Sequence, residues 1–151
     1  MAAAVYSEGI GFRDFPWGTS IEEFTASLGA PVSKESYDGL TSLAYENIEV
    51  SGYMTFMLVY FSKSGLEGGT YYFLTKDYTE LMNCYRSIQL GLMDKYGITA
   101  LFDEILKEVR PYESAWNLAD GYIHLKVNTR RNEPITLWYS SPSLTKKLLG
   151  T

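Results

Sequence analysis

The sequence is poor in cysteine and histidine, and this excludes several kinds of site. Cys84 is the only cysteine among the 151 residues, and His124 is the only histidine. A single cysteine can form no disulfide within the chain and no thiolate cluster for zinc. Any serine–histidine, cysteine–histidine or multi-histidine mechanism would have to use His124. The sequence therefore predicts no metal site and no cofactor.

Positive charge and long apolar runs are also scarce. The formal net charge is -5 and the isoelectric point is about 4.9, whereas nucleic acids and anionic membranes are bound largely through Lys and Arg. The longest apolar candidate, Tyr53–Phe61, is far shorter than the roughly 18 residues of a membrane-spanning helix. We therefore expect no nucleic-acid partner and no membrane-spanning segment.

The first residues lack the features of a signal peptide. Residues 1–11 are small, polar and interrupted by glycine, without a basic start and an apolar core. They fit a natural start as well as a start just after a removed leader. We expect a loose arm here, docked onto the core by Phe12 and Phe15.

Aromatic residues are abundant, with 13 Tyr, 7 Phe and 3 Trp. This favours β-strands and surfaces lined by rings. A length of 151 residues is typical of one domain that can bury a core without disulfides or metals. We therefore interpret residues 1–151 as a single globular domain.

A helix is predicted directly after Trp17, which we expect to anchor it in the core. Thr19 is a suitable N-cap, and Glu22 could complete a capping box. Gly29, followed by Pro31, ends the helix. The buried stripe is expected to consist of Ile21, Phe24 and Leu28.

The next segments predict one loop and three strands. We expect a polar loop over 33–39, a strand over Ser42–Val50 with a skip after Tyr45, and a turn at Ser51–Gly52. The run Tyr53–Phe61 is apolar on both faces, which is typical of a central strand covered on both sides. A hairpin over Ser62–Gly65 leads to a strand over Leu66–Leu74, where Gly68–Gly69 indicate a bulge or a close approach.

The second half repeats this order. Asp77 and Glu80 form a second capping box, which opens a long helix ending at Tyr96–Gly97. A shorter helix over Ile98–Val109 follows, then strands over Tyr112–Asn117, Tyr122–Asn128 and Pro134–Ser140, and a terminal helical turn after Ser141. The predicted fold class is α+β: an antiparallel sheet of about six strands in two αβββ units, with helices on one face.

Chemistry-bearing residues form no catalytic constellation in the sequence. Cys84 lies on the buried stripe of the long helix, far from a helix N-terminus that would activate it. The carboxylates lie at helix starts and on polar faces, where capping and solvation explain them. The glycines lack the context of a phosphate-binding loop. We therefore predict no catalytic residue.

The aromatic strands leave room for a binding surface. Tyrosine and tryptophan on predicted strands must line the uncovered face if helices cover only one side, and such rings suit peptide, glycan or protein recognition. Arg130 and Arg131, on a predicted hairpin tip, could contact an anion or an acidic partner. The candidate binding residues are Tyr71, Tyr122, His124, Arg130, Arg131 and Trp138.

Two resemblances favour particular functions. The segment Trp17–Pro31, with Gly18, Thr19, Glu23 and Phe24 and the ending Leu28-Gly-Ala-Pro31, resembles the start of outer-membrane-assembly lipoproteins and modules with the β-lactamase-inhibitor-protein-like fold. This implies a bacterial binding or scaffold domain outside the cytoplasm, with no catalytic residues to transfer. The order of elements is similar to that of the dimeric chaperones of type III secretion.

The sequence thus supports three hypotheses about function. The first is a non-catalytic binding or protein-interaction module located outside the cytoplasm, with a protein, peptide or glycan as its ligand. The second is a small acidic dimeric chaperone, and the third is a small enzyme with an unrecognised site. The sequence leaves the oligomeric state open.

Overall fold

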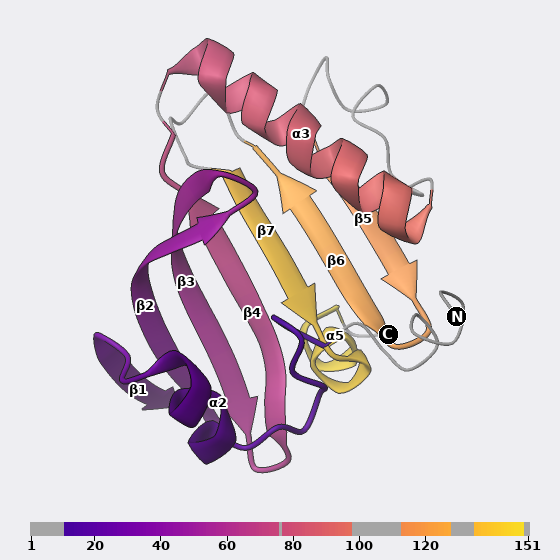
Figure 1. Ribbon diagram of the computed structural model, residues 1–151. Coiled ribbons are helices and arrows are strands. Elements are labelled where there is room, and N and C mark those ends of the chain that lie inside the picture. The colour runs from indigo at the N-terminus through magenta and orange to yellow at the C-terminus, as the bar shows by residue number, and fades with distance from the viewer. Residues whose placement is uncertain (1–10, 76, 98–112, 128–134, 150–151) are drawn as a thin grey trace.

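The computed structural model describes residues 11–75, 77–97, 113–127 and 135–149 (Figure 1). Seven strands form one antiparallel sheet in the order β1-β2-β3-β4-β7-β6-β5. This confirms the α+β class and adds one strand to the six expected. The strands are β1 (Ser33–Tyr37), β2 (Leu40–Val50), β3 (Tyr53–Ser62), β4 (Gly65–Phe73), β5 (Glu113–Leu118), β6 (Gly121–Lys126) and β7 (Ile135–Ser140).

The sheet consists of two meanders joined at one seam. Strands β1 to β4 are consecutive neighbours, as are β5 to β7, and the seam pairs β4 with β7 through residues Phe73↔Ile135 to Gly68↔Ser140. The two predicted units are therefore present, but the first holds four described strands and the second three. Their last strands meet in the middle of the sheet.

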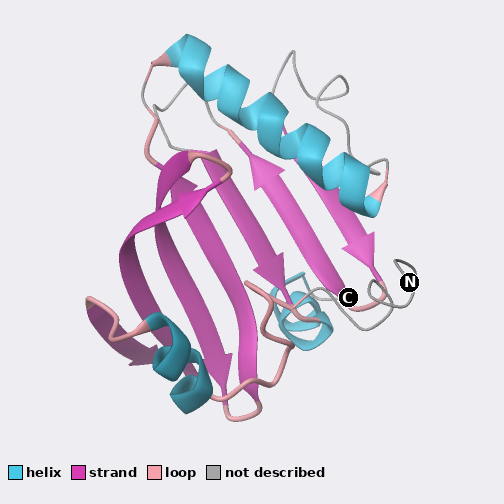
Figure 2. Cartoon of the chain, viewed as in Figure 1, coloured by secondary structure: helices cyan, strands magenta, loops and turns pink. Residues whose placement is uncertain are grey.

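Helices lie on both faces of the sheet. Helices α2 (Ile21–Leu28) and α3 (Tyr78–Tyr96) lie in front of it in Figures 1 and 2, and we call this side the covered face. Helix α5 (Pro142–Leu149) lies on the other side, because its Leu144 lines a hollow with Tyr72 and Trp138. The expectation that all helices share one face therefore holds for α2 and α3 only.

Helix α2 begins one residue later than the capping pattern predicted. Ser20, not Thr19, is the N-cap, and its hydroxyl accepts a hydrogen bond from the backbone N–H of Glu23. Thr19 is unavailable because its hydroxyl donates to the carbonyl of Pro16. The Ser20 hydroxyl also donates to Oε1 of Glu23, so Ser20 and Glu23 pair at the start of the helix where a Thr19–Glu22 capping box was predicted. Phe24 is buried as predicted.

Helix α3 agrees with its predicted boundaries. Asp77 is its N-cap and accepts from the N–H of Glu80, and the N–H of Gly97 bonds the carbonyl of Met93. Tyr78, in the first turn, is exposed although it is aromatic. The buried residues are Leu81, Cys84, Tyr85, Ile88, Gln89 and Leu92.

The two capped helices are attached to the sheet in the same way. The hydroxyl of Tyr45 on β2 donates to the carbonyl of Gly29, which ends α2. The indole N–H of Trp116 on β5 donates to the carbonyl of Gly97, which ends α3. Each helix thus has one of its C-terminal carbonyls satisfied by an aromatic donor from the sheet.

The segment expected to be a polar loop is the edge strand β1. All five of its residues are exposed, and it pairs with β2 from Ser33↔Ala44 to Tyr37↔Leu40. Backbone hydrogen bonds to β2 hold it, so it needs no apolar periodicity. Lys34 and Glu35 on this strand are the kind of charged side chain that discourages further edge pairing.

Strands β2 and β3 confirm one expectation and correct another. The register of β2 shifts between Tyr45 and Ile48, which is the predicted skip. Strand β3 is not the middle strand and is not covered on both sides, because its residues alternate between buried and half-buried. Its second apolar stripe, which includes Phe56 and Tyr60, lies on the face opposite α2 and α3.

Gly68 and Gly69 permit close approaches on opposite faces of β4. A methyl group on Gly69 would lie 2.4 Å from the ring of Phe12, and one on Gly68 would lie 3.0 Å from Leu144 and 2.8 Å from the carbonyl oxygen of Tyr139. The register also shifts where β4 passes Tyr60. Both the bulge and the close approach predicted from this pair are therefore present.

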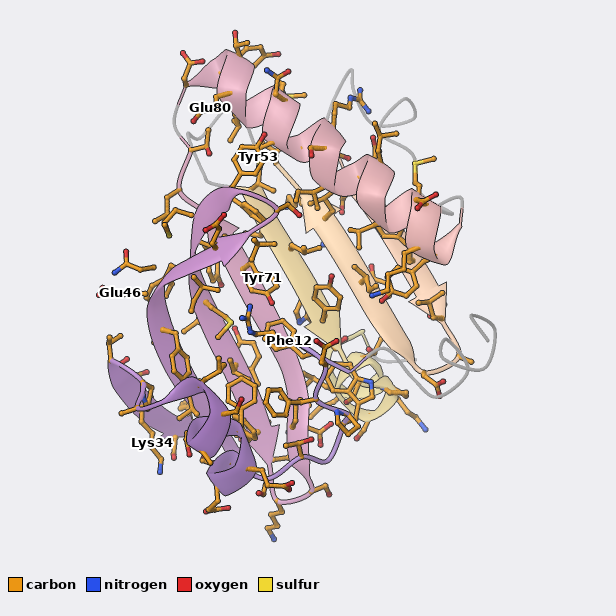
Figure 3. The ribbon with its side chains drawn as sticks, viewed as in Figure 1. Phe12, Lys34, Glu46, Tyr53, Tyr71 and Glu80 are labelled. Carbon is orange, nitrogen blue, oxygen red and sulfur yellow. The ribbon has the colours of Figure 1, made fainter. Side chains whose placement is uncertain are left out.

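Phe12 docks the start of the described chain onto the covered face, as expected. Its ring is buried and lies 5.1 Å from that of Tyr71, and Figure 3 shows the two side by side. Phe15 and Trp17 are only half-buried, although both pack against the core. The indole of Trp17 donates to the carbonyl of Asp120 in the β5–β6 turn, so it links the two meanders.

Some expectations lie outside the described residues. These are the arm over residues 1–10, the helix over 98–109, and the turn that carries Arg130 and Arg131. No helix in the described part of the chain combines the length and apolar character needed to cross a membrane.

Cys84 should be unreactive in the folded protein. It is fully buried in α3, and burial, with a smaller contribution from Glu80, raises the pKa of its thiol to about 12. The thiolate is the nucleophile, so at pH 8 the reactive form is almost absent. We expect Ellman's reagent to detect no thiol in native protein and one per chain in denaturant. Rapid labelling of native protein would contradict this packing.

Candidate ligand-binding face of the sheet

The sheet presents a second face, opposite α2 and α3, which we call the open face. Alternation along each strand places its side chains there, and most of them are half-buried. Within the described chain, α5 is the helix on this side. The open face consists of Phe56, Leu58 and Tyr60 of β3, Thr70 and Tyr72 of β4, Thr136 and Trp138 of β7, and Tyr122, His124 and Lys126 of β6.

One row of paired residues crosses the sheet and sets the geometry of the open face. Leu58 pairs with Thr70, Thr70 with Trp138, and Trp138 with His124. Directly paired side chains lie about 4.5–5.5 Å apart at Cβ. Residues far apart in the sequence are thus brought into one line across the seam between the two meanders.

A hollow of about 410 Å³ lies on this face. Its wall is largely aromatic and aliphatic, with two threonines and a histidine between the rings. Its volume falls in the range of small-ligand sites. The lining residues are Leu40, Tyr60, Thr70, Tyr72, His124, Thr136, Trp138 and Leu144.

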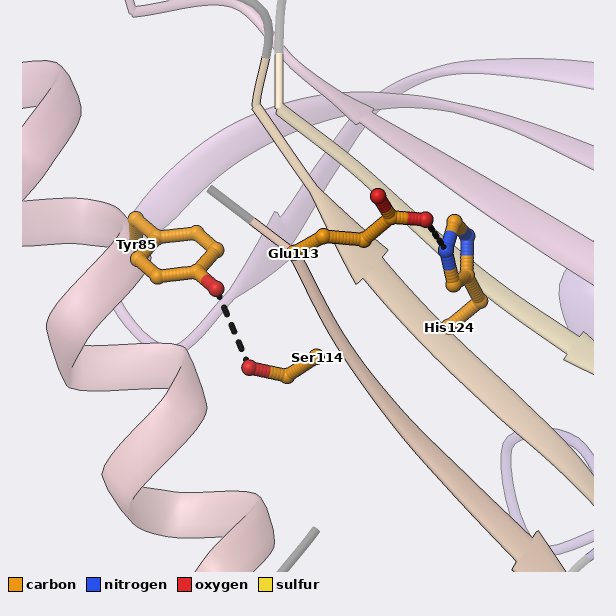
Figure 4. Close-up of polar contacts among 4 residues, drawn as sticks. All are labelled: Tyr85, Glu113, Ser114 and His124. Carbon is orange, nitrogen blue, oxygen red and sulfur yellow. Dashed lines mark hydrogen bonds and ion pairs between the residues drawn. The ribbon is translucent and has the colours of Figure 1, made fainter. Parts of the chain in front are cut away.

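His124 is held in place at the hollow by Glu113. Its Nε2 lies 2.5 Å from Oε2 of Glu113, and both side chains are about one-fifth exposed. Figure 4 shows why: successive residues of β5 reach to opposite sides, Ser114 toward Tyr85 of α3 and Glu113 toward His124 of β6. Tyr122 adds a stacked ring, with its centroid 6.1 Å from that of the imidazole. The imidazole therefore has a fixed orientation.

Several polar groups at the hollow have no hydrogen-bond partner among the described residues. They include the hydroxyls of Thr70 and Thr136, the indole N–H of Trp138 and the Nδ1 atom of His124. Thr70 is 6% exposed. A buried polar group left without a partner costs about 1–3 kcal/mol. The hollow is therefore suited to a ligand that supplies hydrogen-bonding groups as well as apolar surface.

Tyr72 contributes a neutral hydroxyl to the same hollow. Burial is the main cause that raises the pKa of Tyr72 to about 12, and the neighbouring Tyr60 adds to the shift. Burial also raises the pKa of Tyr122, with a contribution from Glu113. These phenols stay protonated at neutral pH and act as uncharged donors and acceptors.

The structure brings together three of the six candidate binding residues. Tyr122, His124 and Trp138 lie on the open face, where the rings of Tyr122 and Trp138 meet edge to face at 5.8 Å. Tyr71 is not part of this group, because it is buried on the covered face against Phe12 and accepts a hydrogen bond from Arg13. Arg130 and Arg131 lie outside the described residues.

Sequence reasoning missed several members of the site. It placed Tyr72 among the strand aromatics but did not select it, and it assigned no binding role to Tyr60 or Leu144. The clean alternation of β7 could have identified Tyr72, since Tyr72 pairs with outward-facing Thr136 while Tyr71 pairs with Leu137. No local sequence pattern predicts that Leu144 packs back against β4.

The described residues contain no cluster of three His, Cys, Asp or Glu side chains that could hold a metal ion. The hollow itself offers His124 as its one good metal donor. What this arrangement can do chemically is stack on a ligand, exchange hydrogen bonds with it, and accept or donate one proton through His124.

No protein-family model and no curated protein sequence match the chain. Solved structures similar to it include two bacterial proteins. One is described as an extracellular protein containing an SCP domain from Bacillus anthracis strain Ames, with a TM-score of 0.49, 14% identity, and coverage of 85% of this chain and 45% of that one.

The other is described as a cysteine-rich secretory protein from Staphylococcus aureus Mu50. Its TM-score is 0.51 at 12% identity, and the match covers 85% of this chain and 44% of that one. The chain therefore spans less than half the length of either protein. At this level of identity the similarity to the second protein shows a shared fold only, and nothing about a binding site follows from it. The resemblance of Trp17–Pro31 to lipoprotein modules remains a prediction.

Proposed function

We propose that the protein is a non-catalytic binding module that acts outside the cytoplasm, with the hollow on the open face as its ligand site. The observation that carries this proposal is the hollow itself, where Tyr60, Tyr72 and Trp138 surround unpaired polar groups. Rigid aromatic rings supply large contact area at little entropic cost, which is why such residues dominate binding sites.

The location outside the cytoplasm rests on a different observation. The structural neighbour with a TM-score of 0.51 is described as a cysteine-rich secretory protein, and the lipoprotein-like segment Trp17–Pro31 favours the same location. The test is fractionation of the source cells with an antibody to this protein. Recovery from the medium or cell envelope supports the proposal, and recovery with cytoplasmic enzymes contradicts it.

Replacing Trp138 with alanine should abolish ligand binding. The indole forms one wall of the hollow, and loss of a central aromatic contact typically raises Kd by at least about thirtyfold. The measurement is a ¹⁵N NMR titration with peptides and oligosaccharides, read from the three indole signals and the backbone amide signals of the native chain, and from the amide signals alone in the variant, which lacks the Trp138 indole. Trp17 and Trp116 are bonded elsewhere, so only the signal of Trp138 should shift.

The matched control is Tyr37→Ala. Tyr37 is 85% exposed at the end of edge strand β1 and does not line the hollow. Its replacement removes an exposed aromatic ring and should leave binding unchanged. Equal loss in both variants, or ligand shifts confined to Trp17 or Trp116, would place the binding surface elsewhere.

One observation favours a second candidate, a small enzyme in which His124 is a general base. A hydrogen bond donated by Nε2 of His124 to the carboxylate of Glu113 could orient the imidazole as carboxylates orient catalytic histidines. Binding remains the first candidate because the described residues lining the hollow include no cysteine, serine or carboxylate that could act as a nucleophile. Conversion of a bound ligand, lost in His124→Gln while binding persists, would support the enzyme.

A further inference from the structure

A second hollow continues the first along the open face. It has a volume of about 310 Å³ and shares Leu40 and Leu144 with the larger hollow. Tyr60 lines the larger hollow and Ser62 the smaller one, and these are successive same-face positions of β3. The two hollows therefore form one groove along the strand, which we call the open-face groove. Its length suits an elongated ligand.

The two ends of the groove differ in chemistry. The larger hollow has aromatic walls and the unpaired groups of Thr70, Trp138 and His124. The smaller hollow is polar, with serines and two lysines, Lys63 and Lys147, at its rim. Both lysines are exposed, and neither forms an ion pair within the described chain. An otherwise acidic protein thus places two free positive charges at one end of its groove.

Glu67 also lines the smaller hollow, but within the described chain it forms no ion pair with either lysine. It is a buried residue of β4, and both its carboxylate oxygens accept hydrogen bonds, one from the hydroxyl of Ser62 and one from that of Ser141, each at 2.5 Å. Both carboxylate oxygens of Glu67 are thus engaged by hydroxyls. One of these hydroxyls, that of Ser141, also accepts a hydrogen bond from the N–H of Leu144 at the start of α5.

We propose that the open-face groove binds an oligosaccharide that carries an anionic group. This rests on the proposed function and names its ligand class. A sugar ring has an apolar face that stacks on an indole or phenol and hydroxyls at its edge. It would satisfy Thr70, Trp138 and His124, which a purely apolar ligand would leave unpaired. The anionic group lies between Lys63 and Lys147, by charge complementarity.

An extended peptide fits the groove less well. Peptides that pair with sheets do so at an edge, where free backbone groups form hydrogen bonds. The groove lies on the face of β3, β4 and β7, whose backbone groups are already engaged in the ladder. A peptide backbone would find few partners there, whereas hydroxyl groups would meet side chains of matching chemistry.

The test uses tetrasaccharides of hyaluronan, galacturonan and alginate, each as the acid and after reduction of its carboxyl groups. Binding is followed by the Trp138 indole signal at low salt. We expect at least one acid to bind at least about threefold tighter than its reduced form, the size of two exposed charge contacts. The double variant Lys63→Gln, Lys147→Gln should remove this preference and leave the affinity for the reduced form unchanged.

The control is Lys34→Gln, which removes an exposed lysine on β1 outside the groove and should preserve the preference for acids. Acid and reduced forms that bind equally would overturn the anionic part of the proposal. Binding of peptides but of no tetrasaccharide through Trp138 would overturn this inference and leave the binding-module proposal standing. No shift of the Trp138 signal with either class would overturn both.

Discussion

Phe12→Ala is expected to lower the free energy of unfolding by about 3–5 kcal/mol, the usual result when a buried phenylalanine is truncated. The ring is 1% exposed and packs against Tyr71 and Tyr139, with centroid distances of 5.1 and 5.6 Å. It fills the space over Gly69, which has no side chain of its own. Its removal leaves a cavity on the covered face at the seam. Urea unfolding followed by circular dichroism measures the loss.

Two controls separate this packing from the general loss of a ring. Phe56→Ala removes a half-buried ring from the open face. It should lower the free energy of unfolding clearly less than Phe12→Ala does. Gly69→Ala should be destabilising in the native chain, because the new methyl would meet the Phe12 ring, and much less so in the Phe12→Ala background. Additive effects of the two substitutions, or a loss under 1 kcal/mol for Phe12→Ala, would contradict this packing.

Gly65→Ala is expected to destabilise the protein by about 2–5 kcal/mol, through a left-handed backbone and a steric clash together. Gly65 has φ +102°, and a methyl group there would lie 2.3 Å from the carbonyl oxygen of Gly18. At this point the segment before α2 pairs with β4, since Gly18 donates to the carbonyl of Leu66 and Leu66 donates to that of Thr19. The methyl would force this pairing apart.

The matched control is Gly52→Ala in the β2–β3 turn. Gly52 also has a positive φ, +86°, but a methyl group there would meet no atom within 4 Å. Its replacement should lower the free energy of unfolding only by the cost of placing alanine in a left-handed backbone conformation, about 1–2 kcal/mol. Equal losses at both positions, measured by thermal or urea unfolding, would mean that the close approach to Gly18 contributes nothing.

The sequence predicts an element well where the signals are local and redundant. Helix α3 has a side-chain cap at Asp77, a glycine stop at Gly97 and a buried stripe between them, and all three agree on its boundaries. Strand β6 alternates without exception, so its inward and outward residues follow from the sequence alone. Each of these patterns reflects an interaction within a few residues, which requires no knowledge of the partner strand.

Local sequence patterns do not predict elements that are held in place by partners distant in the sequence. Strand β1 has no buried residue, so its sequence carries no periodic signal, and only the pairing with β2 makes it a strand. The cap of α2 was predicted one residue too early because Thr19 and Ser20 are both good capping residues. The choice between them depends on the hydrogen bond from Thr19 to Pro16, which the pattern of capping residues does not reveal.

The candidate site also contains residues that local patterns predict and residues that depend on distant strand pairing. Tyr122 and His124 share one side of β6 by alternation, and Trp138 is selected from β7 in the same way, but only the pairing of β6 with β7 puts the three on a common face. Tyr71 and Tyr72 are adjacent, and the bulge near Gly68 leaves the direction of each undecided until the pairing with β7 is known. The contribution of Leu144 depends on α5 folding back across the sheet, and that of Glu113 depends on the register of β5 against β6.

The seam between β4 and β7 has a thermodynamic consequence for any ligand of the hollow. Thr70 belongs to the first meander and Trp138 to the second, and they are direct partners across the seam. Neither half of the chain therefore contains the site by itself. A ligand that binds only the joined sheet must stabilise the joining by mass action. Ligand binding in the groove should therefore raise the free energy needed to separate the two meanders, and a weakened seam should lower the affinity for the ligand.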